Sequence, residues 1–461
     1  MNRYTDLFVI ACVIKIYWFQ GYFLKIGHNE ISTIASLSNY FLLIYSLYLV
    51  VTKKVNIDMK TFKSASWLLG IVCLGMIYEK IHPYSGLLMP IQDDVTNWDR
   101  YILGECSMYP YVPGISEMVR SLFDITSFVF IIVVFKSVFS YKWFVTPYMK
   151  IIGLLKYGIY YGYLEWIIKN LLGNLTITYS LAEMLLGANE ISIYTEATSR
   201  DGVFYTIQGF TREPSYLNGY LFTLALLMLF GNILKRIAKK HKMEIPNTYN
   251  NITLALCIIL FFFTGGFSAV WFLLIVGICA LLLHIRESGI SISEFLIRKK
   301  MFLASFTVVC IMAVGVLSQN DYFYARIMDA FAIINFLSDS SGFAGIAALG
   351  SGDSIGSTIA RFVSLYEGII IFIDRPLMGL SYKVQSVHDW SLMLIINIGI
   401  VGMYFLYKML ISSKEKRRYD FFVLFIIFII GGLPVNICPN ALCVYWVLFF
   451  EVTTYYMNEI E

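Results

Sequence analysis

The sequence predicts an all-α membrane protein with about twelve transmembrane helices, on the basis of its composition and its recurrent apolar stretches. Of its 461 residues, 58% are hydrophobic and only 14% are charged, whereas about 25% of the residues of a soluble domain are charged. A helix needs roughly 20 apolar residues to cross about 30 Å of hydrocarbon, and such stretches occur from the first residues to the last. We therefore interpret residues 1–461 as a single integral membrane domain and exclude a soluble globular enzyme.

The expected spans follow one another closely along the chain. They cover residues 7–24, 31–51, 65–80, 121–139, 147–170, 214–234, 251–265, 267–285, 301–318, 390–410, 421–436 and 440–457. Residues 251–285 form one apolar stretch that is too long for a single span, and Gly265 and Gly266 offer a turn within it. Treating this stretch as one span would reverse the orientation of every later span.

Basic residues support this arrangement, because Lys and Arg in short loops near span ends stay in the cytoplasm. With twelve spans, one side of the membrane collects Lys53, Lys54, Lys60, Lys63, Lys136, Lys142, Lys235, Arg236, Lys239, Lys240, Lys242, Arg286, Arg298, Lys299, Lys300, Lys414, Lys416, Arg417 and Arg418. Both termini are then expected in the cytoplasm. This topology and contact with anionic head groups account for the net charge of +4, so we expect membrane lipids and no nucleic acid as partners.

Three outer loops are too long to be simple connections, at about 81–120, 171–213 and 319–389. Loops of this length usually carry function or are disordered. The first contains aromatic residues such as Trp98, which favour packing over disorder. Within the last, residues 338–357 are rich in Gly, Ser and Ala, a composition that fits either a mobile lid or a slack tether.

An arginine and a carboxylate stand at the outer end of one expected span. Arg212 and Glu213 precede Pro214, at which the span begins. Proline is well placed in the first turn of a helix. A helix start is also a partly positive end that favours anions, so this position is suited to a negatively charged ligand.

Similar residues follow at the outer end of a later span. Arg361 is followed by an Arg-Pro-x-x-Gly pattern from Arg375 to Gly379, and His388-Asp389 stands immediately before the span at Trp390. In their order and placement, the Glu-Pro-Ser box at 213–215 and these later motifs resemble the O-antigen polymerase (Wzy) family and the related O-antigen ligases. The chain departs from related chains at Ser268-Ala269, where these often have Ser-Arg.

The resemblance implies a membrane-embedded glycosyltransferase of the GT-C type, acting in lipopolysaccharide biosynthesis at the periplasmic face of the bacterial inner membrane. It would transfer a growing glycan from undecaprenyl pyrophosphate to the non-reducing end of a newly delivered repeat unit. The partners implied are undecaprenyl-pyrophosphate-linked oligosaccharides and a protein that regulates chain length. A ligase, which would use a lipid A-core acceptor, and a flippase or transporter of lipid-linked oligosaccharides are the alternatives.

The resemblance also suggests roles for individual residues. Arginine binds phosphate oxygens bidentately, and the pyrophosphate-binding candidates are Arg200, Arg212, Arg326 and Arg361. The attacking hydroxyl needs a base with a near-neutral pKa. His388 is the first candidate, and Asp389 and Glu213 are the others. Because the chain has no Asp-x-Asp pair, we expect arginines and no metal ion or cofactor to neutralise the pyrophosphate.

Structural roles compete with several of these interpretations. His388 fits a helix cap, Glu213 fits a partner for Arg212, and Arg375, beside Asp374, is interpreted as structural. Within the fifth span, Glu165 and Lys169 have the i,i+4 spacing of an ion pair. Lys156 and Lys15 are expected to extend toward the membrane interface. The nearby tyrosines fit core packing or a sugar-binding groove, with core packing favoured: Tyr157, Tyr160, Tyr161 and Tyr163.

Overall fold

The computed structural model describes about half of the chain. The described residues are 23–26, 29–84, 114–138, 145–177, 205–209, 211, 214–240, 242, 244–264, 267–287, 365, 368–381, 390–411, 425–426 and 429–430. Their elements are β1 (Phe23–Ile26), β2 (Asn29–Thr33), α2 (Ile34–Val51), α3 (Met59–Ile81), α5 (Ile115–Val138), α6 (Val145–Asn170), α8 (Pro214–Lys240), α9 (Asn251–Phe263), α10 (Phe267–Glu287) and α16 (Trp390–Leu410). Each of these helices overlaps one predicted span.

Part of the described chain is long and apolar enough to cross a membrane. Four segments qualify, at Met59–Ile81, Met118–Ser137, Tyr216–Lys240 and Ser391–Leu410. The predicted spans at 301–318 and 440–457 lie outside the described residues, as do most of 7–24 and 421–436. The chain therefore has the apolar helices of a membrane protein, and the number of twelve spans stays a prediction.

The turn predicted within residues 251–285 is confirmed. α9 ends at Phe263 with Thr264 as its C-cap, and α10 begins at Phe267. α9 has 13 residues, which corresponds to a length of about 20 Å at 1.5 Å per residue. It is therefore shorter than the roughly 30 Å thickness of the hydrocarbon layer.

The described elements are helical, as expected, apart from one short β-hairpin. β1 and β2 pair antiparallel, with Phe23 opposite Thr33 and Ile26 opposite Asn29. They occupy the facing ends of the predicted spans 7–24 and 31–51. Of the β2 residues only Ile31 is apolar, and α2 begins at Ile34, three residues after the predicted start of the span 31–51.

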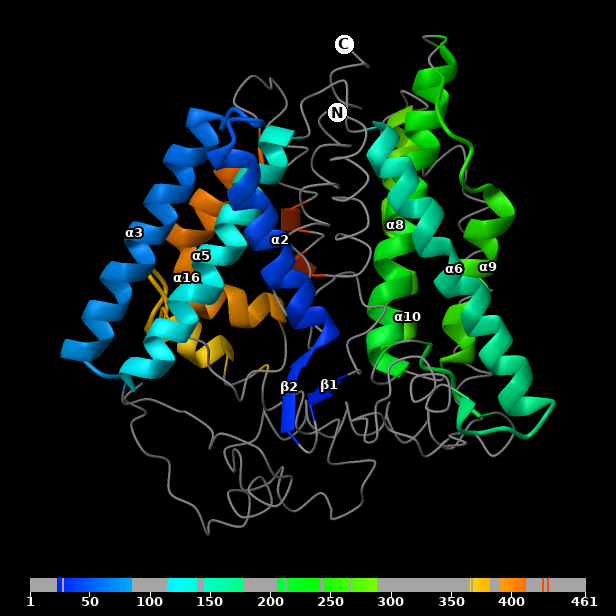
Figure 1. Ribbon diagram of the computed structural model, residues 1–461, viewed down its shortest axis with the longest axis horizontal. Coiled ribbons are helices and arrows are strands. Elements are labelled where there is room, and N and C mark those ends of the chain that lie inside the picture. Colours follow the sequence, from blue (N-terminus) through cyan, green and yellow to red (C-terminus); the bar gives the residue numbers. More distant parts are fainter. Residues whose placement is uncertain are drawn as a thin grey trace.

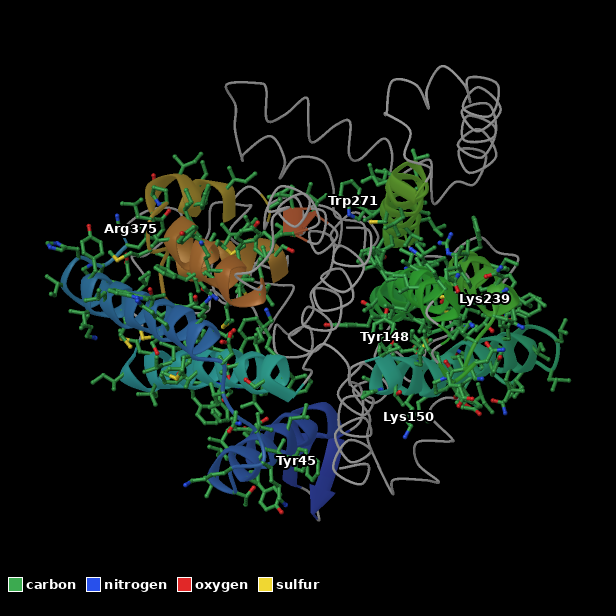
Figure 2. All side chains as sticks on the ribbon, turned by 90° about the horizontal axis from the view of Figure 1, so that it is seen from above. Tyr45, Tyr148, Lys150, Lys239, Trp271 and Arg375 are labelled. Carbon is green, nitrogen blue, oxygen red and sulfur yellow. The ribbon has the colours of Figure 1, made fainter. Side chains whose placement is uncertain are left out.

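The helices pack in two groups, which Figure 1 shows side by side. One group comprises α2, α3, α5 and α16, and the other comprises α6, α8, α9 and α10. Residues near 430 contact both groups, because the Phe425 ring packs on Tyr407 of α16 and the Trp271 indole N–H of α10 donates to the Ile430 carbonyl over 3.3 Å. Trp271 faces the space between the two groups (Figure 2).

The helices α2, α5 and α8 end at the top of Figure 1. Basic residues stand in or just after their last turns, namely Lys53 and Lys54 after α2, Lys136 in α5, and Lys239 and Lys240 in α8. There the Lys136 ammonium donates to the Leu410 carbonyl over 2.5 Å, and the Asp58 N–H donates to Ser137 Oγ. The bond from Lys136 satisfies one of the carbonyls left free at the C-terminus of α16. Which side of the membrane this end faces stays a prediction.

α16 is interrupted at Gly399, which has φ 61° and ψ −176°. The chain from Pro376 to Ser381 fills the interruption through four backbone hydrogen bonds: Leu380 N–H to Ile396 O, Ser381 N–H to Asn397 O, Ile400 N–H to Pro376 O and Val401 N–H to Leu377 O. A Cβ on Gly399 would lie 2.3 Å from the Leu377 oxygen, and one on Gly379 would lie 2.2 Å from the Ile396 oxygen. The two glycines are therefore required for this backbone-to-backbone contact.

We expect Gly399→Ala to destabilise the protein, because the backbone angles there cost a non-glycine residue about 1–3 kcal/mol and the methyl group would also collide with the 377–379 backbone. Thermal unfolding of the detergent-solubilised protein measures this effect. Gly70→Ala and Gly277→Ala are matched controls, since an added Cβ meets nothing within 4 Å at either position. An unchanged melting temperature for Gly399→Ala would contradict the observed interruption of α16.

Candidate functional site

The predicted site residues lie outside the described part of the chain. These are Arg200, Arg212, Glu213, Arg326, Arg361, His388 and Asp389. The described residues include the chain on both sides of the first motif, at Tyr205–Gly209, Thr211 and Pro214, and the start of α16 directly after His388-Asp389. The structure therefore shows how the chain next to these motifs is held, and their proposed roles stay predictions.

The ion pair predicted within the fifth span is confirmed. The Lys169 ammonium lies 2.7 Å from Oε1 of Glu165, one turn away on α6, and the two side chains are 5% and 0% exposed. Burying two charges is costly unless their remaining hydrogen-bonding groups are also satisfied. The contacts of this pair therefore indicate which part of the fold it stabilises.

The remaining hydrogen bonds of the pair hold the chain that leads to Arg212. The Gly209 N–H donates to Oε2 of Glu165 over 2.6 Å, and the Gln208 N–H donates to the same carboxylate over 3.3 Å. The Lys169 ammonium donates to the Thr206 carbonyl over 3.3 Å. The end of α6 thereby supplies hydrogen-bond partners to a stretch of backbone that has no regular secondary structure.

Two further contacts fix the same stretch. The side-chain amide of Asn170 both accepts from the Tyr205 N–H over 2.7 Å and donates to the Tyr205 carbonyl over 3.1 Å. The Ile207 N–H donates to the Phe263 carbonyl at the end of α9. Gly209 has a φ of +61°, a left-handed conformation that favours glycine, and there the chain turns toward α8. The segment Tyr205–Gly209 is thus bonded to both α6 and α9.

A buried polar group joins the start of α8 to the turn between α9 and α10. The Asn218 amide donates to Ser268 Oγ over 3.0 Å and accepts from the Thr264 hydroxyl over 2.7 Å. All three side chains are buried. Ser268 is therefore engaged in a contact between helices.

A second cluster holds the Arg-Pro-x-x-Gly pattern at the end of α3. The Arg375 Nε donates to Oε1 of Glu79 over 2.7 Å, a second guanidinium nitrogen donates to the His82 carbonyl, and Tyr84 donates to the Asp374 carboxylate over 3.1 Å. Burial lowers the pKa of Arg375, but the hydrogen bond to Glu79 and the charges of Glu79, Tyr78 and Tyr84 together raise that pKa by more, so the net change is upward. Arg375 therefore links α3 to the chain that fills the interruption in α16, and its ion-pair partner is the distant Glu79.

The two clusters lie at the same end of the helices, opposite the basic ends. Figure 1 shows the end of α3 and residues 368–381 at the bottom of one group, and the end of α6 and the start of α8 at the bottom of the other. Arg375 projects from the first group in Figure 2. Both motif-bearing stretches thus begin from rigid, internally bonded backbone at one end of the molecule.

Core packing is the wrong interpretation for two tyrosines of α6. Tyr157 and Tyr160 are 53% and 42% exposed and pack edge to face with each other. Tyr163 is partly buried and donates to the Leu256 carbonyl of α9. Lys156 donates to the Thr248 carbonyl over 2.7 Å. The two rings therefore lie on the outer surface of α6.

No known protein family matches this chain, and neither a curated protein nor a solved structure is detectably similar to it. Among the described residues, no three His, Cys, Asp or Glu side chains are grouped as ligands for a metal ion. The function of the chain is therefore inferred from its motifs and from the contacts that hold the backbone beside them.

Several residues that build the two clusters were not predicted. Asn170, Asn218 and Glu79 are single polar residues near the ends of apolar stretches, where polar side chains are common. A polar residue at the outer end of a span, next to a long loop, is the signal that singles them out. Their partners lie 35, 50 and 296 residues away in the sequence, so spacing alone could not have paired them.

We expect Arg375→Ala to destabilise the protein, because Glu79 is 1% exposed in the ion pair and would lose its charged partner. An unsatisfied buried acceptor costs about 1–3 kcal/mol, and more when it is charged. Thermal unfolding in detergent measures the loss, and the exposed Arg120 provides the control Arg120→Ala. The double variant Glu79→Gln/Arg375→Ala should regain part of the stability. Equal melting temperatures for Arg375→Ala and Arg120→Ala would show that the pair stabilises nothing.

Proposed function

We propose that this protein is an O-antigen polymerase. It joins undecaprenyl-pyrophosphate-linked oligosaccharide repeat units at the periplasmic face of the bacterial inner membrane, and it transfers the glycan from the lipid pyrophosphate donor to the non-reducing end of the acceptor repeat. One observation above all supports the proposal. The backbone immediately before the Arg-Glu-Pro box is fixed by a buried ion pair and an asparagine of α6, as expected for a motif that must hold charges in place.

The chemistry explains why fixed arginines suit this reaction. As the glycosidic bond breaks, the pyrophosphate leaving group gains negative charge. Preorganised donors and cations aimed at developing charge are among the largest catalytic contributions, and a single donor is worth roughly 3–4 kcal/mol in well-studied enzymes. Arg200, Arg212, Arg326 and Arg361 are the proposed pyrophosphate-binding residues, with no metal ion or cofactor taking part. An arginine on mobile backbone would have to be ordered during the reaction, which reduces its effect.

The attacking sugar hydroxyl must lose its proton, and His388 is the proposed general base. It stands two residues before Trp390, the first residue of α16. Asp389 either orients His388 or is the base itself, and Glu213 is a third candidate. The chain that fills the interruption in α16 ends at Ser381, seven residues before His388, so this motif also starts from fixed backbone.

The phenotype of a deletion strain separates the polymerase from its alternatives, because the three proteins act in sequence on one lipid-linked repeat. Without a polymerase, single repeats are still delivered and ligated, so we expect lipopolysaccharide capped by one repeat. We expect the same banding from His388→Ala, since loss of a general base slows catalysis by roughly 10²–10⁴-fold. Bare core with polymer left on the carrier would indicate a ligase, and absence of both kinds of cap would indicate a flippase. Normal ladders from His388→Ala would move the base to Glu213 or Asp389.

The pyrophosphate assignment predicts that Arg212→Ala and Arg361→Ala each abolish elongation while the protein still inserts and accumulates. Arg361→Lys should rescue poorly, because the lysine ammonium is a point charge without the bidentate fork of arginine. Banding of the surface glycan, normalised to the amount of protein in the membrane, measures both effects. Arg120→Ala, at an exposed position of α5, is the control for loss of an arginine. Polymer of normal length from both alanine variants would rule out this assignment.

A further inference from the structure

The buried charges of α6 serve irregular backbone instead of another helix. Glu165 uses both carboxylate oxygens on the Gln208 and Gly209 N–H groups as well as on Lys169. Lys169 in turn bonds the Thr206 carbonyl. A pair that merely joined two helices would find its partners on a neighbouring helix, as Tyr163 of α6 does at the Leu256 carbonyl of α9. The bonds of the pair to the backbone instead reach three residues of one irregular stretch, Thr206, Gln208 and Gly209.

The bonded stretch ends very close to the proposed pyrophosphate-binding motif. The Thr211 hydroxyl donates to the Gln208 carbonyl over 2.6 Å, and Thr211 is 2% exposed. Pro214 begins α8, which is anchored one turn later by the buried Asn218. Only Arg212 and Glu213 lie between these two fixed points in the sequence. Because a residue spans at most about 3.6 Å, any displacement of Thr211 changes where the two charged residues can reach.

We propose that Glu165, Lys169 and Asn170 are positioning residues that fix where Arg212 and Glu213 meet a polyprenyl-linked diphosphate. The proposal rests on the proposed function for the identity of that ligand. These three residues act through the backbone, and none of them needs to touch the substrate. Asn170 holds Tyr205 at the beginning of the stretch, and the ion pair holds Thr206 to Gly209.

Lys156 provides a matched control on the same helix. Its ammonium also donates to a backbone carbonyl, that of Thr248, over 2.7 Å. Thr248 lies just before α9, at the end of that helix opposite to Phe263, whose carbonyl bonds Ile207 in the stretch before the motif. Lys169→Met and Lys156→Met thus each remove one ammonium from α6 and one hydrogen bond to irregular backbone. Lys169→Met also leaves the buried Glu165 carboxylate without its cation, so a purely structural role predicts a lower melting temperature for Lys169→Met but no change at the motif while the protein is folded. A positioning role predicts that Lys169→Met disturbs the motif in the folded protein and that Lys156→Met does not.

The first readout is independent of enzymatic activity. The thiol introduced by Arg212→Cys is labelled with a membrane-impermeant maleimide in the intact, folded protein. The labelling rate of the wild-type chain is subtracted as background. We expect Glu165→Gln or Lys169→Met to change that rate at least tenfold and Lys156→Met to change it less than twofold. Equal rates in all backgrounds, with every variant folded, would overturn the proposal.

The second readout is polymerisation of lipid-linked repeat units by the purified protein. We expect Glu165→Gln and Lys169→Met to lower kcat/KM for the donor at least tenfold at temperatures below their melting transitions, with Lys156→Met near wild type. We also expect a double-mutant cycle with Arg212→Lys to show a combined loss smaller than the product of the single losses, because both changes act on one group.

Unchanged kcat/KM or strictly multiplicative losses would overturn the positioning role. If the wild-type protein had no polymerase activity but the variants showed the expected changes in labelling rate, the proposed function would be overturned. The positioning of residue 212 would still stand.

Discussion

The fold depends on one constraint, which is that backbone N–H and C=O groups surrounded by apolar material must find partners within the protein. Helices meet this requirement by themselves, but the described chain also contains two irregular stretches at one end of the helices, at Tyr205–Gly209 and Pro376–Ser381. The first obtains its partners from charged and amide side chains of α6. The second obtains them from the backbone of α16, which is interrupted for that purpose at Gly399. In both stretches, the irregular backbone is covered by a specific set of donors and acceptors.

The same constraint explains how the second group of helices is held together. Tyrosine hydroxyls of one helix donate to backbone carbonyls of the next, as Tyr148 does to Leu227 over 2.5 Å and Tyr163 does to Leu256 over 2.9 Å. Tyr148 lies inside this group in Figure 2. Apolar side chains gain little by packing against each other when the alternative is lipid, so contacts between membrane helices depend on close packing and hydrogen bonds. A hydroxyl at the tip of a large apolar ring supplies both.

The sequence was sufficient to predict those features of the fold that depend on length and apolarity alone. The helices of the described chain, the break between α9 and α10 and the Glu165–Lys169 pair follow from local rules of span length, glycine placement and i,i+4 spacing. The interruption of α16 could not be predicted, because Gly399 resembles the nearby Gly402 in sequence and only its contact with Leu377 distinguishes it. Likewise, Arg375 has Asp374 beside it, yet its ion-pair partner is Glu79, 296 residues away. Local rules cannot supply contacts that the packing of distant segments creates.

The Glu165–Lys169 pair of α6, which anchors the backbone of residues 206–209, is also compatible with a positively charged motif beside it. A lone buried carboxylate would bind the Gln208 and Gly209 N–H groups equally well, but its charge would attract and partly neutralise a neighbouring arginine. At an illustrative separation of about 10 Å and an effective dielectric constant of about 20, that attraction amounts to roughly 1.7 kcal/mol. Lys169, at 2.7 Å from Glu165, cancels most of this field, because a neutral pair acts at a distance only as a dipole. The anchor therefore fixes the backbone without reducing the positive charge that the proposed chemistry requires from Arg212.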